Sequence, residues 1–254
     1  AVLLRHQLPR FVSGQEESRF EQLPPEVRNA VLGATINVLQ GSDESEVLRL
    51  TADMAGELGA IALSGGDGTP RFPEWMTLVE ACAQLLQSES TAAQKRAALL
   101  CIGEVGSRVG GNLERVRENF VVSLAALTAQ TLQDAELSVA TAAMQAFVKL
   151  LPEMQEEVRD DVSHKVAPAL LAVAERAVKR LDDAEANRAL TSLCSALVEC
   201  ETLLCSDESL HRAMGLAQAC VSNDDLRALD DEVRRSAVEV LVTQAQFAGT
   251  TYGG

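Results

Sequence analysis

The sequence predicts an all-α solenoid of about five and a half stacked helix pairs. A helical phrase recurs along the chain: Glu46-Val47-Leu48-Arg49 precedes Gly56-Glu57-Leu58-Gly59, and Ala93-Gln94-Lys95-Arg96 precedes Gly103-Glu104-Val105-Gly106 at the same internal spacing. A third version of the opening is Glu232-Val233-Arg234-Arg235. Self-similarity at about 47 residues indicates paired-helix repeats, because one helix pair cannot bury its apolar face alone.

Two further observations support this fold class. Acidic side chains stand near the start of each predicted second helix, at Asp43, Glu89, Asp134, Asp183 and Asp231, which are 46, 45, 49 and 48 residues apart. Such residues cap helix N-termini. The chain is also 47% apolar but only 3% aromatic. A core built mainly from Ala and Leu is typical of helix-on-helix packing.

The first complete repeat is predicted at about 25–63. Pro24-Pro25 suits a helix start, and Gly41 ends that first helix. Its expected buried stripe is Val27, Val31, Ala34 and Val38. The second helix begins near Ser42 and Asp43, and its expected buried stripe is Val47, Leu50, Met54, Leu58 and Ile61.

The later repeats are predicted at 73–109, 112–151, 153–205 and 207–247. The second of the array starts at Pro73-Glu74-Trp75 and buries a stripe of Trp75, Leu78, Cys82 and Leu85, followed by Ala98, Cys101, Val105 and Val109. The third buries Val116, Phe120, Leu124 and Leu127, then Val139, Ala143, Phe147 and Leu150. The fourth ends in a helix at 183–205 that buries Ala186, Leu190, Leu193, Leu197, Cys200 and Leu204.

The opening residues, 1–14, have a helical pattern without a cap, as expected of the second helix of an earlier repeat. A complete solenoid needs polar capping repeats at its ends. We therefore expect the chain to be a single solenoid fragment of a longer array.

The charge and cysteine content exclude several function classes. There are 22 basic and 37 acidic residues, a net charge of −15, which repels phosphate backbones and favours basic partners. The six cysteines form no C-x-x-C pair and are interpreted as small buried residues in a reducing compartment. No apolar run is long enough for a membrane span, and no signal peptide is recognised, which favours cytosol or nucleus.

Several segments resemble the N-terminal part of importin-β (karyopherin-β) nuclear transport receptors, which are built from HEAT repeats. Ala1-Val2-Leu3-Leu4-Arg5 resembles the second helix of the first repeat of that family. Phe72-Pro73-Glu74 resembles the tryptophan-proline-glutamate start of its third repeat, with Phe72 in place of tryptophan. The stretch from Ser90 through Lys95 to Val109 resembles the helix that follows, and the Leu23-Pro24-Pro25 entry is most similar to the importin-five branch.

The resemblance implies that second helices line a concave face that binds the Ran GTPase in its GTP form, while later surfaces hold basic cargo with nuclear localisation signals. First helices would offer convex grooves to Phe-Gly nucleoporins, and the protein would shuttle between cytoplasm and nucleus. The residues implied to contact Ran are Glu46, Arg49, Asp53, Glu57, Arg96, Glu104 and Arg108. The alternative for each of them is a solvated helix flank without a partner.

Catalytic and metal chemistry finds no support in the sequence. Gly65-Gly66-Asp67-Gly68 follows no strand and precedes no Gly-Lys-Ser/Thr, so an inter-helix loop is expected rather than a phosphate cradle. The histidines, His6, His164 and His211, lie on separate repeats without ligand companions. Glu57 and Glu104 could be considered as a general acid–base pair. They belong, however, to successive second helices, which are expected to stack about 10 Å apart, a packing distance between repeats rather than the spacing of a catalytic site.

We therefore expect no enzyme activity, no cofactor and no metal. The alternative function is a HEAT scaffold that organises a cytosolic signalling or trafficking complex and never meets Ran. Periodicity does not separate these two functions, since both need the same stacked core.

Overall fold

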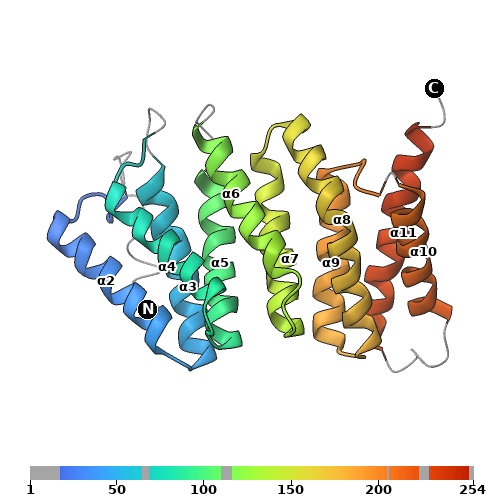
Figure 1. Ribbon diagram of the computed structural model, residues 1–254, viewed down its shortest axis with the longest axis horizontal. Helices are drawn as coiled ribbons and strands as arrows, with labels where there is room; N and C mark the ends of the chain where they lie inside the picture. Colours follow the sequence, from blue (N-terminus) through green and yellow to red (C-terminus); the bar gives the residue numbers. More distant parts are fainter. Residues whose placement is uncertain (1–17, 65–68, 110–115, 205, 223–228, 252–254) are drawn as a thin grey trace. The chain divides into compact units, whose positions relative to one another are not determined.

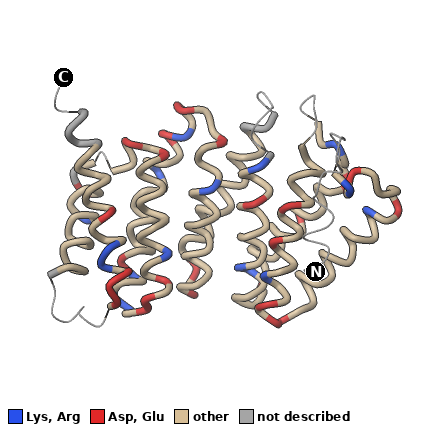
Figure 2. The backbone as a smooth tube through the Cα atoms, turned by 180° about the vertical axis from the view of Figure 1, so that it is seen from behind, with Lys and Arg blue, Asp and Glu red and all other residues tan. Residues whose placement is uncertain are grey.

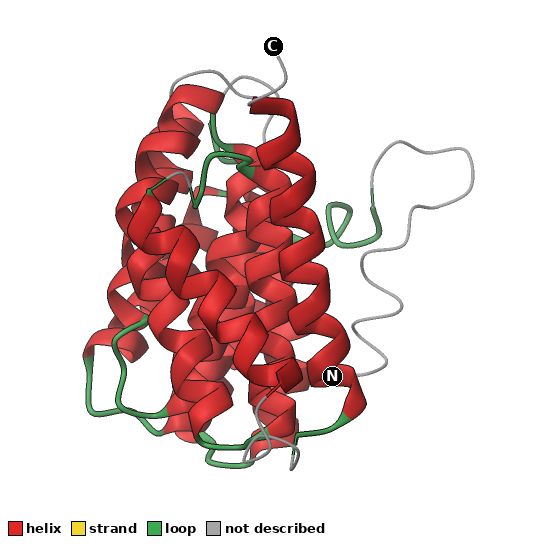
Figure 3. Ribbon diagram, turned by 90° about the vertical axis from the view of Figure 1, so that its right-hand side faces the viewer, coloured by secondary structure: helices red, strands yellow, loops and turns green. Residues whose placement is uncertain are grey.

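The computed structural model describes residues 18–64, 69–109, 116–204, 206–222 and 229–251, and every regular element in these ranges is helical (Figures 1 and 3). The elements follow in the order α2 (Pro25–Gly41), α3 (Ser45–Leu63), η1 (Pro73–Trp75), α4 (Met76–Gln87), α5 (Ala92–Val109), α6 (Val116–Thr131), α7 (Leu137–Leu150), η3 (Leu151–Glu153), α8 (Glu156–Lys179), α9 (Asp183–Glu199), α10 (Asp207–Ser222) and α11 (Asp231–Thr251). The all-α prediction is confirmed. None of the described helices combines the length and the hydropathy that crossing a bilayer requires.

The chain divides into two compact units, Ala1–Leu127 and Thr128–Gly254. The helix predicted at 1–14 and the glycine loop at 65–68 lie outside the described residues. The assignment of the whole chain to one solenoid domain stays a prediction.

Three helix starts are capped one or two residues away from the predicted positions. Asp182 Oδ1 accepts the Glu185 N–H at 3.1 Å, and Asp230 Oδ1 accepts the Val233 N–H at 2.9 Å. Thr91 and Gln94 bond reciprocally: each backbone N–H meets the side-chain oxygen of the other, at 3.0 and 3.3 Å, which is a capping box. The sequence therefore locates these three helix starts to within two residues, but the capping side chain is a neighbour of the one predicted. At α3 and α7 the N-cap residues are Glu44 and Glu136, without a side-chain capping bond, in place of the predicted Asp43 and Asp134.

In unit 1, α3 packs against α2 on one side and α5 on the other, and α4 covers α5. Trp75, Leu78, Cys82 and Leu85 are all buried, as predicted. Trp75 and Phe20 are fully buried with ring centroids 5.1 Å apart and edge-to-face geometry. These rings fix the 18–23 segment and the start of the second repeat in the same core.

The predicted stripe of α2 is wrong by one residue. The buried residues are Arg28, Leu32, Thr35 and Leu39, while Val27 and Ala34 are exposed. Burial of Arg28 explains the shift: its guanidinium carbon lies 3.9 Å from the centre of the Phe72 ring, and Nη1 donates to the carbonyls of Glu21 and Leu23. A cation with this many partners occupies a core position that periodicity alone gives to an apolar residue.

Other stripes need smaller corrections. In α3, Met54 and Leu58 are buried as predicted, but Leu48 is buried where Val47 was expected. In α6, Val121 takes the place expected for Phe120. The side chains of Val109 and Val116 lie outside the described residues. The predicted 183–205 helix ends at Glu199, and Leu203 and Leu204 are buried in the turn that follows it.

Successive second helices in unit 1 approach closely because α3 presents glycine to α5. A Cβ at Gly56 would overlap the Glu104 Cβ, and one at Gly59 would meet Val105 Cγ2 at 3.0 Å and Leu78 Cδ2 at 3.1 Å. The Gln94 amide nitrogen donates to the carbonyls of Gln40 at 2.8 Å and Ser42 at 3.3 Å, which joins the start of α5 to the α2–α3 turn. The glycine of the recurring phrase thus has a packing role.

In unit 2 the second helices α7, α9 and α11 pack in sequence, and the first helices α8 and α10 pack on α9 and α11 (Figure 1). The helix starts are again joined by polar contacts. Arg176 Nη2 donates to the carbonyls of Asp134 at 2.9 Å and Ala135 at 3.0 Å, and Asp183 Oδ1 accepts the Asp230 N–H at 3.0 Å.

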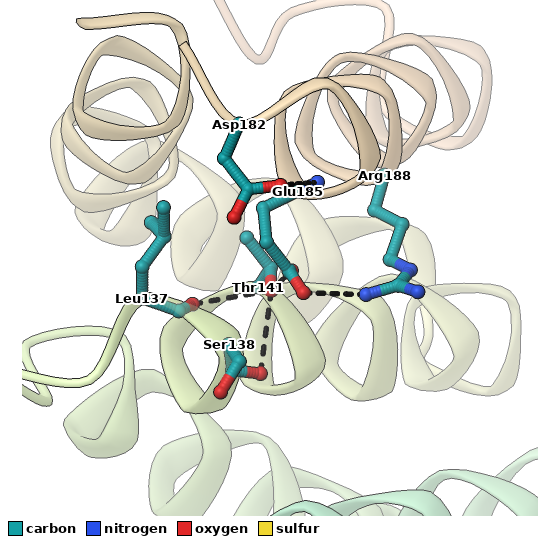
Figure 4. Close-up of polar contacts among 6 residues, drawn as sticks. All are labelled: Leu137, Ser138, Thr141, Asp182, Glu185 and Arg188. Carbon is teal, nitrogen blue, oxygen red and sulfur yellow. Dashed lines mark hydrogen bonds and ion pairs between the residues drawn. The ribbon is translucent and has the colours of Figure 1, made fainter. Parts of the chain in front are cut away.

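A buried carboxylate connects α7 to α9 (Figure 4). Glu185 accepts the Thr141 hydroxyl at one oxygen and the Arg188 guanidinium at the other, and both Glu185 and Thr141 are buried. A buried carboxylate is tolerated when each oxygen has a donor, so this arrangement specifies the register of the two helices.

The corrected register of α3 gives a direct test. Leu58→Ala removes a fully buried side chain between stacked helices and should lower the free energy of unfolding by about 2–5 kcal/mol. Val47→Ala, at a position that is 37% exposed, should lower it by less than about 1 kcal/mol. Urea denaturation of both variants measures the difference, and equal losses would contradict the register.

The Thr141–Glu185 contact gives a second test. Thr141→Val keeps the shape of the side chain but leaves one buried carboxylate oxygen without its hydroxyl donor, at a cost of about 1–3 kcal/mol in the free energy of unfolding. Ser195→Ala, at an exposed position of α9, is the control and should change stability by less than about 0.5 kcal/mol. A Thr141→Val variant as stable as the control would show that the hydroxyl contributes nothing.

Candidate partner-binding face

The structure places the seven predicted contact residues on two neighbouring second helices of unit 1. Four of them are on α3, and Arg96, Glu104 and Arg108 are on α5, which packs directly against α3. Acidic and basic residues both occur along these helices (Figure 2). The set contains four carboxylates and three guanidinium groups, so its recognition pattern is mixed rather than uniformly acidic.

The first cluster is centred on Arg49 of α3. Its guanidinium bonds both oxygens of Glu46, at 2.7 and 3.0 Å, and lies 3.2 Å from Asp53 Oδ2. The hydrogen bond from Arg49 lowers the pKa of the Glu46 carboxyl, and the same bond raises the pKa of Arg49. The spacing of three and four residues puts all three groups on one helix flank.

The second cluster joins the two helices. Arg108 Nη2 lies 3.1 Å from Glu104 Oε2 and 3.9 Å from Glu57 Oε1. Glu57 and Glu104 hold the same position in the recurring phrase, and the close contact at Gly56 brings their helices near enough for one guanidinium to reach both. Glu57 and Glu104 thus share one guanidinium group. The predicted helix spacing of about 10 Å had suggested that the two carboxylates would be too far apart to act together.

Arg96 is exposed on α5, and the structure does not join it to either cluster. The sequence patterns identify the charged positions, but they do not show that Gly56 lets α3 and α5 approach closely enough to bring Glu57 near Glu104. The signal was available in the repeated Gly56-Glu57-Leu58-Gly59 and Gly103-Glu104-Val105-Gly106 phrases, because glycine at a fixed place in a helix indicates close approach of another element.

Within the described ranges, no three His, Cys, Asp or Glu side chains converge as metal ligands. His164 Nε2 bonds the carbonyl and hydroxyl of Thr202, and His211 lies on α10, while His6 is outside the described residues.

The cysteines mostly behave as the small core residues that the sequence predicts. Cys82, Cys101, Cys200 and Cys220 are buried free thiols, whereas Cys194 is partly exposed. Burial raises the pKa of the Cys200 and Cys220 thiols, which disfavours the thiolate that a nucleophile requires. Cys205 lies outside the described residues.

Solved structures of the karyopherin Kap121p have a fold similar to that of this chain. The crystal structure of Kap121p matches with a TM-score of 0.68 and 15% sequence identity, over 89% of this chain and 20% of that one. The karyopherin Kap121p bound to the SUMO protease Ulp1p gives 0.68 and 16% over 91% and 21%, and Kap121p bound to Nup53p gives 0.67 and 15% over the same shares. The chain therefore spans about one fifth of the length of these relatives. No curated protein sequence matches it significantly.

A family model described as IPO5-like, TPR repeats matches residues 43–201, which is more than half of the chain. The repeat spacing of 45 to 49 residues is closer to the HEAT length than to the shorter TPR unit, and both are stacked helix pairs. The chain belongs to the IPO5-like family of helical-repeat proteins, within the importin-β group that its sequence resembles.

Proposed function

We propose that the chain is a segment of a nuclear import receptor that binds the GTP form of Ran through the α3–α5 face. The segment would also contribute to the binding of basic cargo and Phe-Gly nucleoporins. The observation that carries the proposal is the IPO5-like family match across 43–201, which includes all seven residues of that face. Kap121p, whose fold the chain shares, has been crystallised with Nup53p, Ulp1p and Ste12p.

The physical properties of the face suit recognition of a folded partner. Arg49 and Arg108 have side chains that are 51% and 49% exposed, and each is held by two carboxylates of its own face. Holding a long side chain before binding reduces the entropy lost on complex formation. Arginine is also enriched among residues that dominate interface energies.

In this proposal the protein acts by binding alone, without enzyme activity or a cofactor, and shuttles between cytoplasm and nucleus. Its net charge of −15 favours basic cargo and disfavours direct contact with nucleic acid. A scaffold that never meets Ran is the competing function, and it differs in having no preference for the GTP form of Ran.

The first experiment measures equilibrium binding of the chain to Ran loaded with a non-hydrolysable GTP analogue and, separately, with GDP. An import receptor should bind the GTP form at least about tenfold more tightly, a difference of about 1.4 kcal/mol. Equal affinity for both forms, or binding to neither, would favour the scaffold.

A second experiment tests the face itself. Arg49→Glu and Arg108→Glu each reverse a half-exposed charge and should weaken GTP-form binding by about tenfold or more, because the partner then meets repulsion. Lys165→Glu makes the same change in charge at another exposed i,i+4 ion pair, with Asp161 on first helix α8, and should leave affinity within about twofold. Similar losses in all three variants would indicate a general effect of net charge rather than a specific face.

A further inference from the structure

The fourth residue of the recurring helical phrase is arginine in both second helices of unit 1. It is Arg49 in α3 and Arg96 in α5. Arg49 forms ion pairs with the carboxylate three residues before it and with the one four residues after it, which are Glu46 and Asp53. Arginine at this position of the phrase can therefore be paired by carboxylates of its own helix.

The sequence of α5 supplies neither partner to Arg96. The corresponding positions are Ala93 and Leu100, which are both partly buried, while Arg96 is exposed. Within the described part of the chain, Arg96 forms no ion pair and no side-chain hydrogen bond. The α3–α5 face thus contains two guanidinium groups that carboxylates already hold, those of Arg49 and Arg108, and a third that its own face leaves unpaired.

The other charged residues of the face do not neutralise Arg96. They form two groups, each with one guanidinium and two carboxylates and hence a net charge of −1. The first group is Glu46, Arg49 and Asp53, and the second is Glu57, Glu104 and Arg108. Among the described residues, none of these four carboxylates lies within ion-pair distance of Arg96. Arg96 is therefore a separate recognition point, opposite in sign to both groups.

An unpaired guanidinium imposes a condition on any protein that covers this face. Burial of a charge without an acceptor is strongly unfavourable, whereas a charge that keeps its own counter-ion can be covered at a smaller cost. Arg49 and Arg108 keep their counter-ions, so they tolerate a partner that is uncharged at those points. A partner that covers Arg96 must itself supply the acceptor.

We propose that Arg96 determines the specificity of the α3–α5 face by selecting partners that present a carboxylate to it. The inference rests on the proposed function, in which the partner is the GTP form of Ran. A carboxylate can bond the planar guanidinium through two parallel hydrogen bonds, and apolar atoms beside it would contact Ala93 and Leu100. A partner without this carboxylate would leave the Arg96 charge buried and unpaired, which is how an interface rejects the wrong partner.

The experiment compares variants of the chain for binding to Ran loaded with a non-hydrolysable GTP analogue. Arg96→Gln removes the charge but keeps a long polar side chain, and it should lower the affinity by about tenfold or more. The matched control is Arg235→Gln, at the same position in the third version of the phrase. Arg235 is exposed on α11, outside the α3–α5 face, and its replacement should change the affinity by less than about twofold.

A second pair of variants gives Arg96 a partner without removing it. Ala93→Glu places a carboxylate three residues before Arg96, as Glu46 stands before Arg49. This variant should lower the affinity by about fivefold or more, because the guanidinium is then already engaged. Ala93→Gln adds a side chain of the same size without the charge and should bind about threefold or more tighter than Ala93→Glu. Urea midpoints equal to that of the parent chain show that each variant is folded.

Charge reversal identifies the carboxylate on the partner. Each exposed Asp and Glu of Ran is changed to Lys in turn, and at least one Ran variant should bind Arg96→Glu about tenfold more tightly than unchanged Ran does. If the parent chain does not prefer the GTP form of Ran, both the proposed function and this inference are wrong. If the parent chain prefers it but Arg96→Gln binds equally well, Ala93→Glu matches Ala93→Gln, or no Ran variant restores binding to Arg96→Glu, the role of Arg96 alone is overturned.

Discussion

Direct contact between successive second helices is the constraint on which the rest of the structure depends. In unit 1 it joins α3 to α5, and in unit 2 it joins α7 to α9 and α9 to α11. A single helix pair leaves one apolar side uncovered, so each pair is stable only with a neighbour. At Gly56 the contact is close enough to exclude any side chain, which fixes the position of α5 relative to α3.

Polar contacts at the helix starts complement this apolar stacking. Gln94, Arg176 and Asp183 each connect the start of one second helix to an adjacent repeat through backbone groups. Backbone partners are available whatever the side chains of the neighbour, so such contacts persist in a repeat array whose sequence is degenerate. Stacking sets the distance between repeats, and these bonds limit sliding along the helix axis.

The same geometry produces the candidate partner-binding face. Because α3 and α5 are held close, Arg108 reaches Glu57 on the neighbouring helix as well as Glu104 on its own. Exposed ion pairs of this kind contribute little to stability, typically about 0–1 kcal/mol, so their main effect at this face is to hold the two guanidinium groups in position.

The sequence by itself determined the helical class, the repeat spacing, the family and most of the helix boundaries, because periodic apolar residues and Gly, Pro and acidic caps are local signals. The tertiary structure decided which flank of a helix is buried. A shift of one residue changes the direction of a side chain by about 100°, which is comparable to the width of the buried face, so the apolar pattern alone fits two neighbouring registers. Arg28 instead of Val27, and Leu48 instead of Val47, are such cases. It also decided that Gly56 contacts Glu104, because this outcome depends on a residue about one repeat away along the chain.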